Sequence, residues 1–216
     1  MINAIEKKVL VWLAKRQPLW VTSDMLTAIG SFGALLTGLG FWLTRYGVDW
    51  LWLSSVGLVI NWYGDSLDGT LARVRNCQRP IYGYYLDHTV DCVNEAFMFI
   101  GAGLSPLVNL NLTLIAYTLY LLITINVSIN AHLKSEFRLT YAKLGPTEFR
   151  LLIILVNTLL VVCPALAFKK ILVVGHSLSL FDLTTLYIIV ILSAIYTATI
   201  ITDARKYAQI DPPPGK

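Results

Sequence analysis

The sequence has little charge and little cysteine. Only 14% of its 216 residues are charged, while 56% are hydrophobic. The cysteines, Cys77, Cys92 and Cys163, are too few and too scattered for a disulfide framework or a zinc site, so we expect free thiols. The net charge of +4 is small and gives no reason to expect a nucleic-acid partner. These shortages leave a chain dominated by long apolar runs.

The apolar runs are long enough to cross a lipid bilayer, which takes about 20 residues per helix. We predict an all-α fold, an integral membrane bundle of six transmembrane helices that forms a single membrane-embedded domain over residues 1–216. The predicted spans lie near residues 24–44, 48–70, 84–107, 111–132, 149–168 and 180–202. Residues 208–216 are expected to form a short disordered tail.

The N-terminal segment, residues 1–20, is not long or apolar enough to span. It carries an apolar stripe along one side of a helix, with lysines off the stripe, which is typical of a helix that lies on anionic lipid. The stripe consists of Ile2, Ile5, Val9, Trp12 and Leu13. A signal peptide is the competing interpretation, but the segment lacks an adequate apolar core and a small-residue cleavage site. We therefore predict an interfacial amphipathic helix.

The lysines and arginines divide unequally between the two sides of the predicted membrane. All but three of the 17 lie before the first span, in the second and fourth connections, or after the last span. The exceptions are Arg45, Lys169 and Lys170. Cytoplasmic loops carry an excess of lysine and arginine. Both termini are therefore predicted to be cytoplasmic, at the inner membrane if the organism is bacterial.

Four aspartates lie in or at the ends of the second and third predicted spans: Asp65, Asp68, Asp87 and Asp91. A carboxylate at membrane depth is costly unless it is paired, wetted or metal-bound, so a functional interpretation is favoured. At about 100° per residue, Asp65 and Asp68 share one helix face. Asp87 and Asp91 are four residues apart and stack on the next helix. The two acidic pairs can converge on the cytoplasmic side.

Converging carboxylates form a hard oxygen-ligand set that suits magnesium, manganese or calcium rather than zinc. His88 lies one step round from Asp87 and is predicted to point about 100° away from the carboxylate face, so we leave it out. Glu95, one turn beyond Asp91, is interpreted as a buried acid with a polar partner rather than a further ligand. Arg73 adds a fork-shaped donor suited to phosphate. This combination indicates phosphoryl chemistry with two metal ions.

The order of these residues matches a known signature. The runs Asp65-Ser-Leu-Asp68-Gly69-Thr-Leu-Ala72-Arg73 and Gly83-Tyr-Tyr-Leu-Asp87-His-Thr-Val-Asp91 resemble the D-x-x-D-G-x-x-A-R and G-x-x-x-D-x-x-x-D halves of the CDP-alcohol phosphotransferase motif. Nine residues, 74–82, separate the halves where eight are usual. The extra residue is expected to alter that loop more than the aspartate geometry.

A second, weaker resemblance lies upstream. Trp20-Val-Thr-Ser-Asp24-Met-Leu-Thr27 resembles the V-T-P-N-x-L-T segment of the same family, with Ser-Asp where Pro-Asn is usual. The simpler interpretation is a helix N-cap at Thr22 or Ser23 and nothing more.

The resemblance implies an activity and a set of roles. It implies a phospholipid-synthesis transferase that moves a substituted phosphate from a CDP-linked donor, with CDP-diacylglycerol favoured, to an alcohol with release of CMP. Two divalent cations, Mg²⁺ or alternatively Mn²⁺, would be held by Asp65, Asp68, Asp87 and Asp91. Asp91 would also be the general base. The nucleotide site would be shaped by Gly69, Ala72, Arg73 and Gly83. A homodimer in the lipid bilayer is implied as well.

Another basic cluster leads into the fifth span: Lys134, Arg138, Lys143 and Arg150. For the first three, ordinary positive-inside charge is the favoured interpretation. Arg150 lies at the start of the span, where a cation needs a partner. In relatives that use phosphorylated acceptors, basic residues of this region line the acceptor pocket, so Arg150 is a candidate acceptor-binding residue.

Other functions remain open. The segment Gly145-Pro146-Thr147-Glu148 and the run Leu86-Asp87-His88 resemble choline- and ethanolaminephosphotransferases. CDP-choline or CDP-ethanolamine would then be the donor and diacylglycerol the acceptor. From a different class, the aspartates could line an ion path in a transporter. A transporter gives no reason for the Asp-Gly-x-x-Ala-Arg arrangement, and no inverted repeat is visible.

Overall fold

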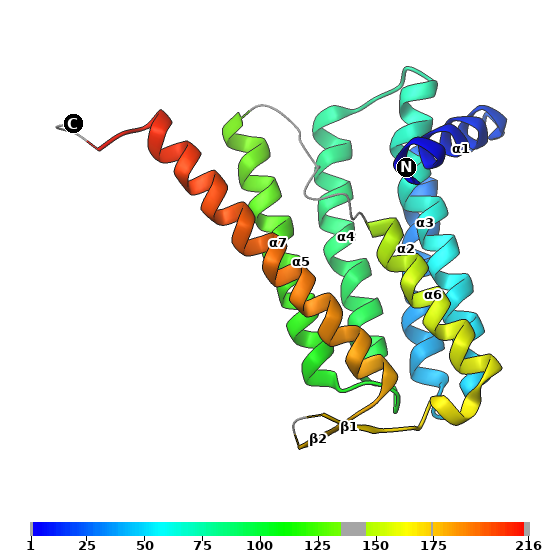
Figure 1. Ribbon diagram of the computed structural model, residues 1–216. Helices are drawn as coiled ribbons and strands as arrows, with labels where there is room; N and C mark the ends of the chain where they lie inside the picture. The colour runs from blue at the N-terminus through cyan, green and yellow to red at the C-terminus, as the bar shows by residue number, and fades with distance from the viewer. Residues whose placement is uncertain (1, 135–145, 174, 214–216) are drawn as a thin grey trace.

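The computed structural model of the chain is built from long α-helices (Figure 1). It describes residues 2–134, 146–173 and 175–213. The α-helices are α1 (Ile2–Arg16), α2 (Ser23–Leu43), α3 (Leu51–Val74), α4 (Pro80–Gly103), α5 (Leu110–Lys134), α6 (Pro146–Val162) and α7 (Leu180–Ile210). Two 3-10 turns, η1 (Val48–Trp50) and η2 (Pro164–Leu166), and two strands, β1 (Ile171–Val173) and β2 (His176–Leu178), complete the order. Helices α2 to α7 form the bundle, and α1 lies across one end of it (Figure 1).

Each predicted span overlaps one α-helix, and the largest differences are at the ends of α6 and α7. Helix α6 ends at Val162 rather than near residue 168. Pro164 lacks a backbone donor and disfavours the helical conformation at Cys163, which explains the early end. Helix α7 continues to Ile210, so residues 208–210 of the expected disordered tail are helical. Residues 214–216 lie outside the described part.

The described chain is mostly helical, as predicted, but a short hairpin that the sequence did not predict lies between α6 and α7. Strands β1 and β2 pair antiparallel there, with Ile171 opposite Leu178 and Val173 opposite His176. Gly175 has a φ of +80°, a left-handed conformation that glycine adopts without a steric cost. The hairpin lies at the end of the bundle opposite to α1 (Figure 1).

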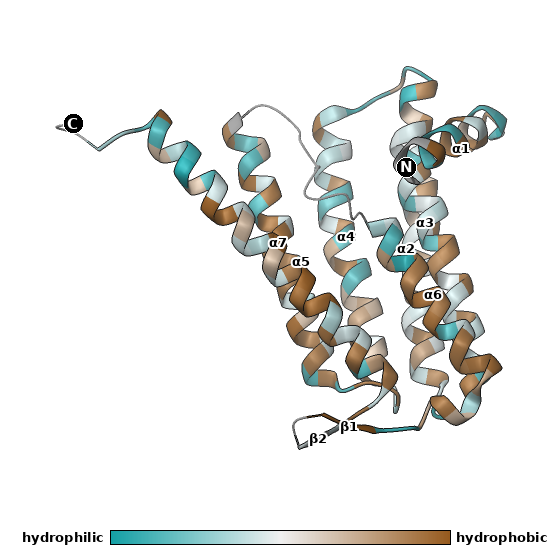
Figure 2. Ribbon diagram, viewed as in Figure 1, coloured by the Kyte–Doolittle hydropathy of each residue, from teal (hydrophilic) through white to brown (hydrophobic). Residues whose placement is uncertain are grey.

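Within the part of the chain that the structure describes, three helices, α2, α5 and α7, are long and apolar enough to cross a membrane. In Figure 2 much of the ribbon of α6 and α7 has the colour of hydrophobic residues. Helices α3 and α4 contain the aspartates, and α6 has 17 residues. Six spans therefore stay a prediction. Both described ends of the chain lie at the same end of the bundle as the α3–α4 connection (Figure 1).

Helix α1 packs against the bundle through Leu10 and Ala14, which are buried in one apolar cluster with Leu67 and Leu71 of α3. Its side chains Ile5, Val9 and Trp12 are exposed. The helix thus buries one side and presents apolar residues on another, although its placement on lipid stays a prediction.

Helices α2 and α3 approach each other closely through glycines. A Cβ added to Gly64 would lie 2.3 Å from the backbone nitrogen of Gly30, and one added to Gly33 would lie 2.3 Å from that of Asn61. Asn61 donates from Nδ2 to the carbonyl oxygen of Gly30 at 3.1 Å. This close packing fixes the part of α3 that carries Asp65.

The opposite end of the bundle is closed by the cap of α7. Ser179 and Asp182 form a capping box, in which each side chain accepts from the backbone of the other residue. Asp182 also accepts from the backbone nitrogen of Asn109 at 2.7 Å, and Ser179 donates to the carbonyl of Leu107 at 2.6 Å. The start of α7 is thereby tied to the segment that leads into α5.

Candidate active site

Three of the four predicted aspartates converge. Asp65 on α3 and Asp87 and Asp91 on α4 each offer a carboxylate oxygen, and these oxygens all lie within 4.8 Å of one another. All three residues are half-buried. Like charges at this spacing repel strongly inside a protein, so the group favours a cation between its members. The hard oxygen donors of this group fit magnesium or manganese.

Asp68, the fourth predicted ligand, is not in that group. Its Oδ2 accepts from the Thr27 hydroxyl at 2.7 Å, and its Oδ1 accepts from the backbone nitrogen of Gly69. Ser23 donates to the carbonyl oxygen of Asp68 at 2.9 Å. The start of α2 therefore orients Asp68.

The start of α2 also corrects the sequence interpretation. Thr22 is the N-cap, with its side chain accepting from the backbone nitrogen of Met25, as expected. The idea that this segment is a cap and nothing more is wrong, because Ser23 and Thr27 contact Asp68. The weak resemblance of this segment to the family motif was the available signal.

Arg150 reaches the aspartate group from α6. Its Nη2 donates to Oδ2 of Asp65 at 2.6 Å, and only 12% and 21% of the two side chains are exposed. The required partner of this cation at the start of a span is therefore Asp65, which the sequence analysis did not identify. Since Arg150 contacts a predicted metal ligand, it belongs to the site whether or not it also binds an acceptor.

The residues predicted to shape the nucleotide site lie at the ends of α3 and α4. Arg73 is exposed and donates from Nη2 to the Thr70 hydroxyl at 3.0 Å. Gly83 is exposed, and a Cβ added there would meet nothing within 4 Å. Gly69 lies against the Arg73 guanidinium, because a Cβ added to Gly69 would be 3.4 Å from Nη1 of Arg73. Ala72, also on α3, is half-buried. The open space at Gly83 and the exposed guanidinium of Arg73 suit a phosphate-bearing ligand.

The loop with the extra residue is compact. Asn76 has a φ of +53°, and Cys77 and Asn76 donate back to the carbonyls of Ala72 and Arg73, which is a Schellman ending for α3. Pro80 then begins α4 at its first turn. The three aspartates converge with this loop in place, so the additional residue does not separate the two halves of the motif.

Arg75 of this loop has a structural role. Its guanidinium donates to the backbone carbonyls of Gln17, Pro18 and Val21. It therefore holds the connection between α1 and α2 against the end of α3, and these contacts occupy its guanidinium.

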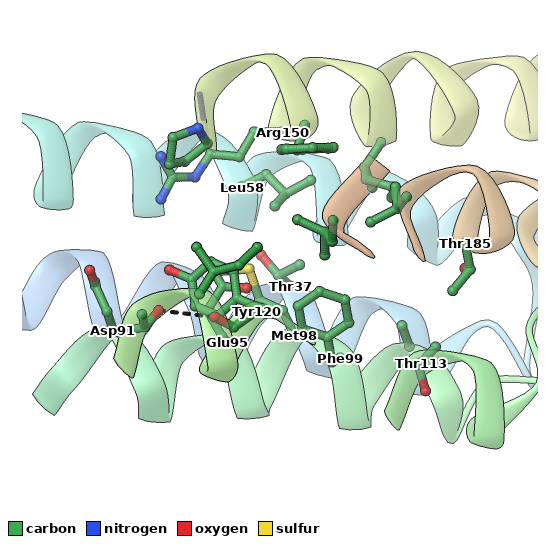
Figure 3. A pocket seen from close by; sticks show the side chains of 18 of the residues that line it. Thr37, Leu58, Asp91, Glu95, Met98, Phe99, Thr113, Tyr120, Arg150 and Thr185 are labelled. Carbon is green, nitrogen blue, oxygen red and sulfur yellow. Dashed lines mark hydrogen bonds between the residues drawn. The ribbon is translucent and has the colours of Figure 1, made fainter. Parts of the chain in front are cut away.

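The aspartate group opens into a cavity of about 500 Å³ (Figure 3). At one end of it lie Asp91, Glu95, Tyr120 and Arg150, and toward the other lie Phe99, Thr113 and Thr185 (Figure 3). The remaining wall is mainly apolar and comes from α2, α3, α4, α5, α6 and α7. The site thus joins an acidic mouth to an apolar interior.

Two residues that the sequence analysis set aside line this cavity. His88 lies in the wall, stacked on Tyr84 with ring centroids 4.1 Å apart, and its Nδ1 is 3.6 Å from Oδ2 of Asp87. Glu95 lines the cavity but is not in the group of three aspartates. His88 was predicted to point away from the carboxylates, but its ring lies close to the carboxylate of Asp87.

Arg138 and Lys143 lie outside the described residues, as does the side chain of Lys134, the last residue of α5.

Known proteins resemble parts of this chain. A phosphatidylinositol phosphate synthase of Cutibacterium acnes is 36% identical over 84 residues, which is 39% of this chain and 38% of that protein. Cholinephosphotransferase 1 of Mus musculus is 33% identical over 100 residues, and that of Bos taurus is 31% identical over 100. These two matches cover 44% of this chain and 25% and 24% of the relatives, so each match spans well under half of the relative's own length.

A family-wide comparison covers much more of the sequence. The sequence profile described as CDP-alcohol phosphatidyltransferase matches residues 20–195, which include α2 to α6 and half of α7. The matched region contains all four motif aspartates and Arg150. The chain therefore belongs to the CDP-alcohol phosphatidyltransferase family.

Proposed function

We propose that this protein is an integral membrane transferase of phospholipid synthesis. It moves a substituted phosphate from a CDP-linked donor, CDP-diacylglycerol in the favoured case, to an alcohol and releases CMP. The observation that carries the proposal is the group of Asp65, Asp87 and Asp91, with oxygens within 4.8 Å of one another at the mouth of an apolar cavity. Family membership supports the same reaction class.

The aspartates would hold two divalent cations, magnesium in the favoured case. When bound, such ions neutralise phosphate oxygens and stabilise the entering and leaving oxygens of a displacement. Asp65, Asp87 and Asp91 already form a converging oxygen set. Asp68, oriented by Thr27, would complete it.

The chemical step needs a base near the cavity. We assign this role to Asp91, whose carboxylate lines the cavity and would accept the hydroxyl proton of the acceptor. The acceptor oxygen then bonds to the phosphorus attached to diacylglycerol, and the bond from that phosphorus to the CMP oxygen breaks. CMP leaves with the electron pair of that bond.

The nucleotide would lie at the exposed ends of α3 and α4. The open space at Gly83 allows a pyrophosphate to approach the backbone closely. The exposed Arg73 would bind a phosphate oxygen with its planar fork. Gly69 and Ala72 keep the adjoining face of α3 free of bulk.

The apolar cavity supports a lipid as one substrate. It begins at Asp65, Asp87 and Asp91 and continues to Phe41, Val108 and Phe181. An acyl chain or a glycerol ester fits such a lining better than a polar metabolite does. Arg150 at its mouth would contact a phosphate, on a phosphorylated acceptor in the favoured case.

A second candidate is transfer from CDP-choline or CDP-ethanolamine to diacylglycerol. The similarity over 100 residues to two cholinephosphotransferases favours it, as does the sequence Gly-Pro-Thr-Glu, whose Pro146 begins α6. Both candidates place the active site on the cytoplasmic side, where nucleotide-activated donors are made. A homodimer also stays a prediction.

CMP release by purified protein tests the proposal. CDP-diacylglycerol would be offered with inositol, inositol phosphate, glycerol phosphate or serine, and CDP-choline or CDP-ethanolamine with diacylglycerol, each with Mg²⁺ and with a chelator. We expect magnesium-dependent CMP release with one donor class. Absence of CMP from every donor with folded protein in lipid would disprove the proposal.

A further inference from the structure

Glu6 of α1 links the two helices that carry Asp65 and Arg150. Its Oε1 accepts from the Trp62 indole nitrogen on α3 at 2.7 Å. The same oxygen accepts from the Thr147 hydroxyl on α6, also at 2.7 Å. Three helices that are distant in sequence therefore meet at one carboxylate oxygen.

Both donors lie close to the active site along their own helices. Thr147 is in the first turn of α6, three residues before Arg150, which places the two residues on neighbouring positions of one face. Trp62 is three residues before Asp65 on α3 and lies on the same side as that aspartate. Glu6 thus ties α3 to α6 beside the ion pair between Arg150 and Asp65.

This arrangement constrains the start of α6. A hydrogen bond to a carboxylate is stronger than one between neutral groups. Removal of the Glu6 carboxylate would leave the Thr147 hydroxyl and the Trp62 indole without this acceptor. The first turn of α6 would then be held less firmly, and Arg150 would lose its fixed approach to Asp65.

We propose that Glu6 is a positioning residue of the active site, which holds the first turn of α6 so that Arg150 stays on Asp65. Its catalytic consequence rests on the proposed function, whereas its effect on α6 does not. The link also connects the site to α1, whose exposed apolar residues Ile5 and Trp12 are predicted to face lipid.

The role of Glu6 can be separated from the attachment of α1. Leu10 and Ala14 are buried against α3 and are not involved in the Glu6 contacts. Helix α1 should therefore stay attached in Glu6→Ala. Any effect of this substitution on α6 is then due to the lost carboxylate rather than to a lost helix.

Hydrogen–deuterium exchange of the full-length protein tests the effect on α6. Glu6→Ala and Thr147→Val should raise amide exchange in residues 147–153 by about tenfold, the scale of one lost hydrogen bond to a charged group. Thr147→Ser, which retains the hydroxyl, and Lys7→Gln, on an exposed neighbour, should match wild type. Trp62→Phe provides a second way to break the link. Unchanged exchange in Glu6→Ala and Trp62→Phe would overturn the proposal.

CMP release tests the catalytic consequence through a double-mutant cycle. Thr147→Val should lower kcat/KM by about tenfold in wild type but by less than about twofold in the Arg150→Ala background, because that background already lacks the side chain through which the lost positioning acts. Equal losses in both backgrounds would mean that Thr147 acts only on general stability and would overturn the positioning role. If wild type released no CMP, the proposed function would fail, and the exchange measurement would still decide the effect on α6.

Discussion

Arg150 on α6 and Asp65 on α3 form an ion pair, with Nη2 and Oδ2 2.6 Å apart and the two side chains only 12% and 21% exposed. The pair joins two positions 85 residues apart in the sequence. Because Asp65 also belongs to the group with Asp87 and Asp91, Arg150 supplies a positive charge to three converging carboxylates. Cations bound at this group must therefore either share Asp65 with Arg150 or displace Arg150, which could then contact a substrate phosphate.

Asparagine at Asp65 or Asp87 should reduce CMP release by at least about a hundredfold, since each change removes a charged ligand from the group. A chelator should have the same effect on wild type, and added Mg²⁺ should restore wild type but not the variants. Both variants should elute like wild type, and Asp87→Asn should also melt like wild type, whereas Asp65→Asn should melt earlier because it removes the charged partner of Arg150. Near-normal turnover in a folded Asp87→Asn protein would contradict the metal assignment.

Asp68 and Thr27 provide a matched pair of predictions. Asp68→Asn should reduce turnover at least about a hundredfold, whereas Thr27→Val should cost about tenfold, since it removes only the hydrogen bond that orients Asp68. Thr27→Ser should behave like wild type because it retains the hydroxyl. Mg²⁺ titrations of all three proteins provide the measurement, and a normal Mg²⁺ requirement in Asp68→Asn would remove Asp68 from the ligand set.

Asp91→Asn tests the assignment of the base. If Asp91 accepts the acceptor proton, transfer should be abolished, while binding of CDP-diacylglycerol weakens less than in Asp68→Asn, because a lost base stops proton transfer without an equal loss of cation and donor binding. Donor binding and turnover would be measured on the same preparations. If both quantities fell equally in the two variants, Asp91 would act chiefly as a ligand.

Arg150→Lys separates a phosphate clamp from a simple partner of Asp65. Lysine can pair with Asp65 but reproduces poorly the two parallel hydrogen bonds of a guanidinium. We expect the KM of a phosphorylated acceptor to rise about tenfold while the KM of CDP-diacylglycerol stays nearly constant. An unphosphorylated preferred acceptor together with unaltered kinetics would favour the choline- or ethanolamine-type reaction.

Cysteine labelling tests the predicted orientation. An external thiol reagent should reach single cysteines at Lys170 and Leu172, beside the β1–β2 hairpin, but not at Lys8, Arg79 or Lys206, because the lysine- and arginine-rich side is predicted to be cytoplasmic. Permeabilised membranes serve as the control in which all five positions react. If cysteines at positions 8 and 206 reacted in intact cells, the orientation would be the opposite of the one predicted.

Much of the fold could be predicted from local pattern alone. Long apolar runs located the helices α2, α3, α4 and α5 and the start of α7 to within a few residues, since a helix that faces lipid must be apolar over most of its length. The errors at Val162 and Ile210 lie at helix ends, where a proline or a polar last turn decides the boundary. The β1–β2 hairpin was missed because six paired residues at a turn produce no long-range sequence pattern.

The identity of the site residues is a property of the sequence, and their arrangement is a property of the tertiary structure. The spacing of Asp65, Asp68, Asp87 and Asp91 predicted two acidic helix faces, because helical periodicity is local and regular. Which oxygens meet depends on how helices pack, and packing brought three carboxylates together while Thr27 of α2 took up Asp68. The pairing of Arg150 with Asp65 and the link from Glu6 to Thr147 join residues 85 and 141 positions apart. No periodicity extends over such separations, so only the close packing of α1, α3 and α6 could decide those contacts.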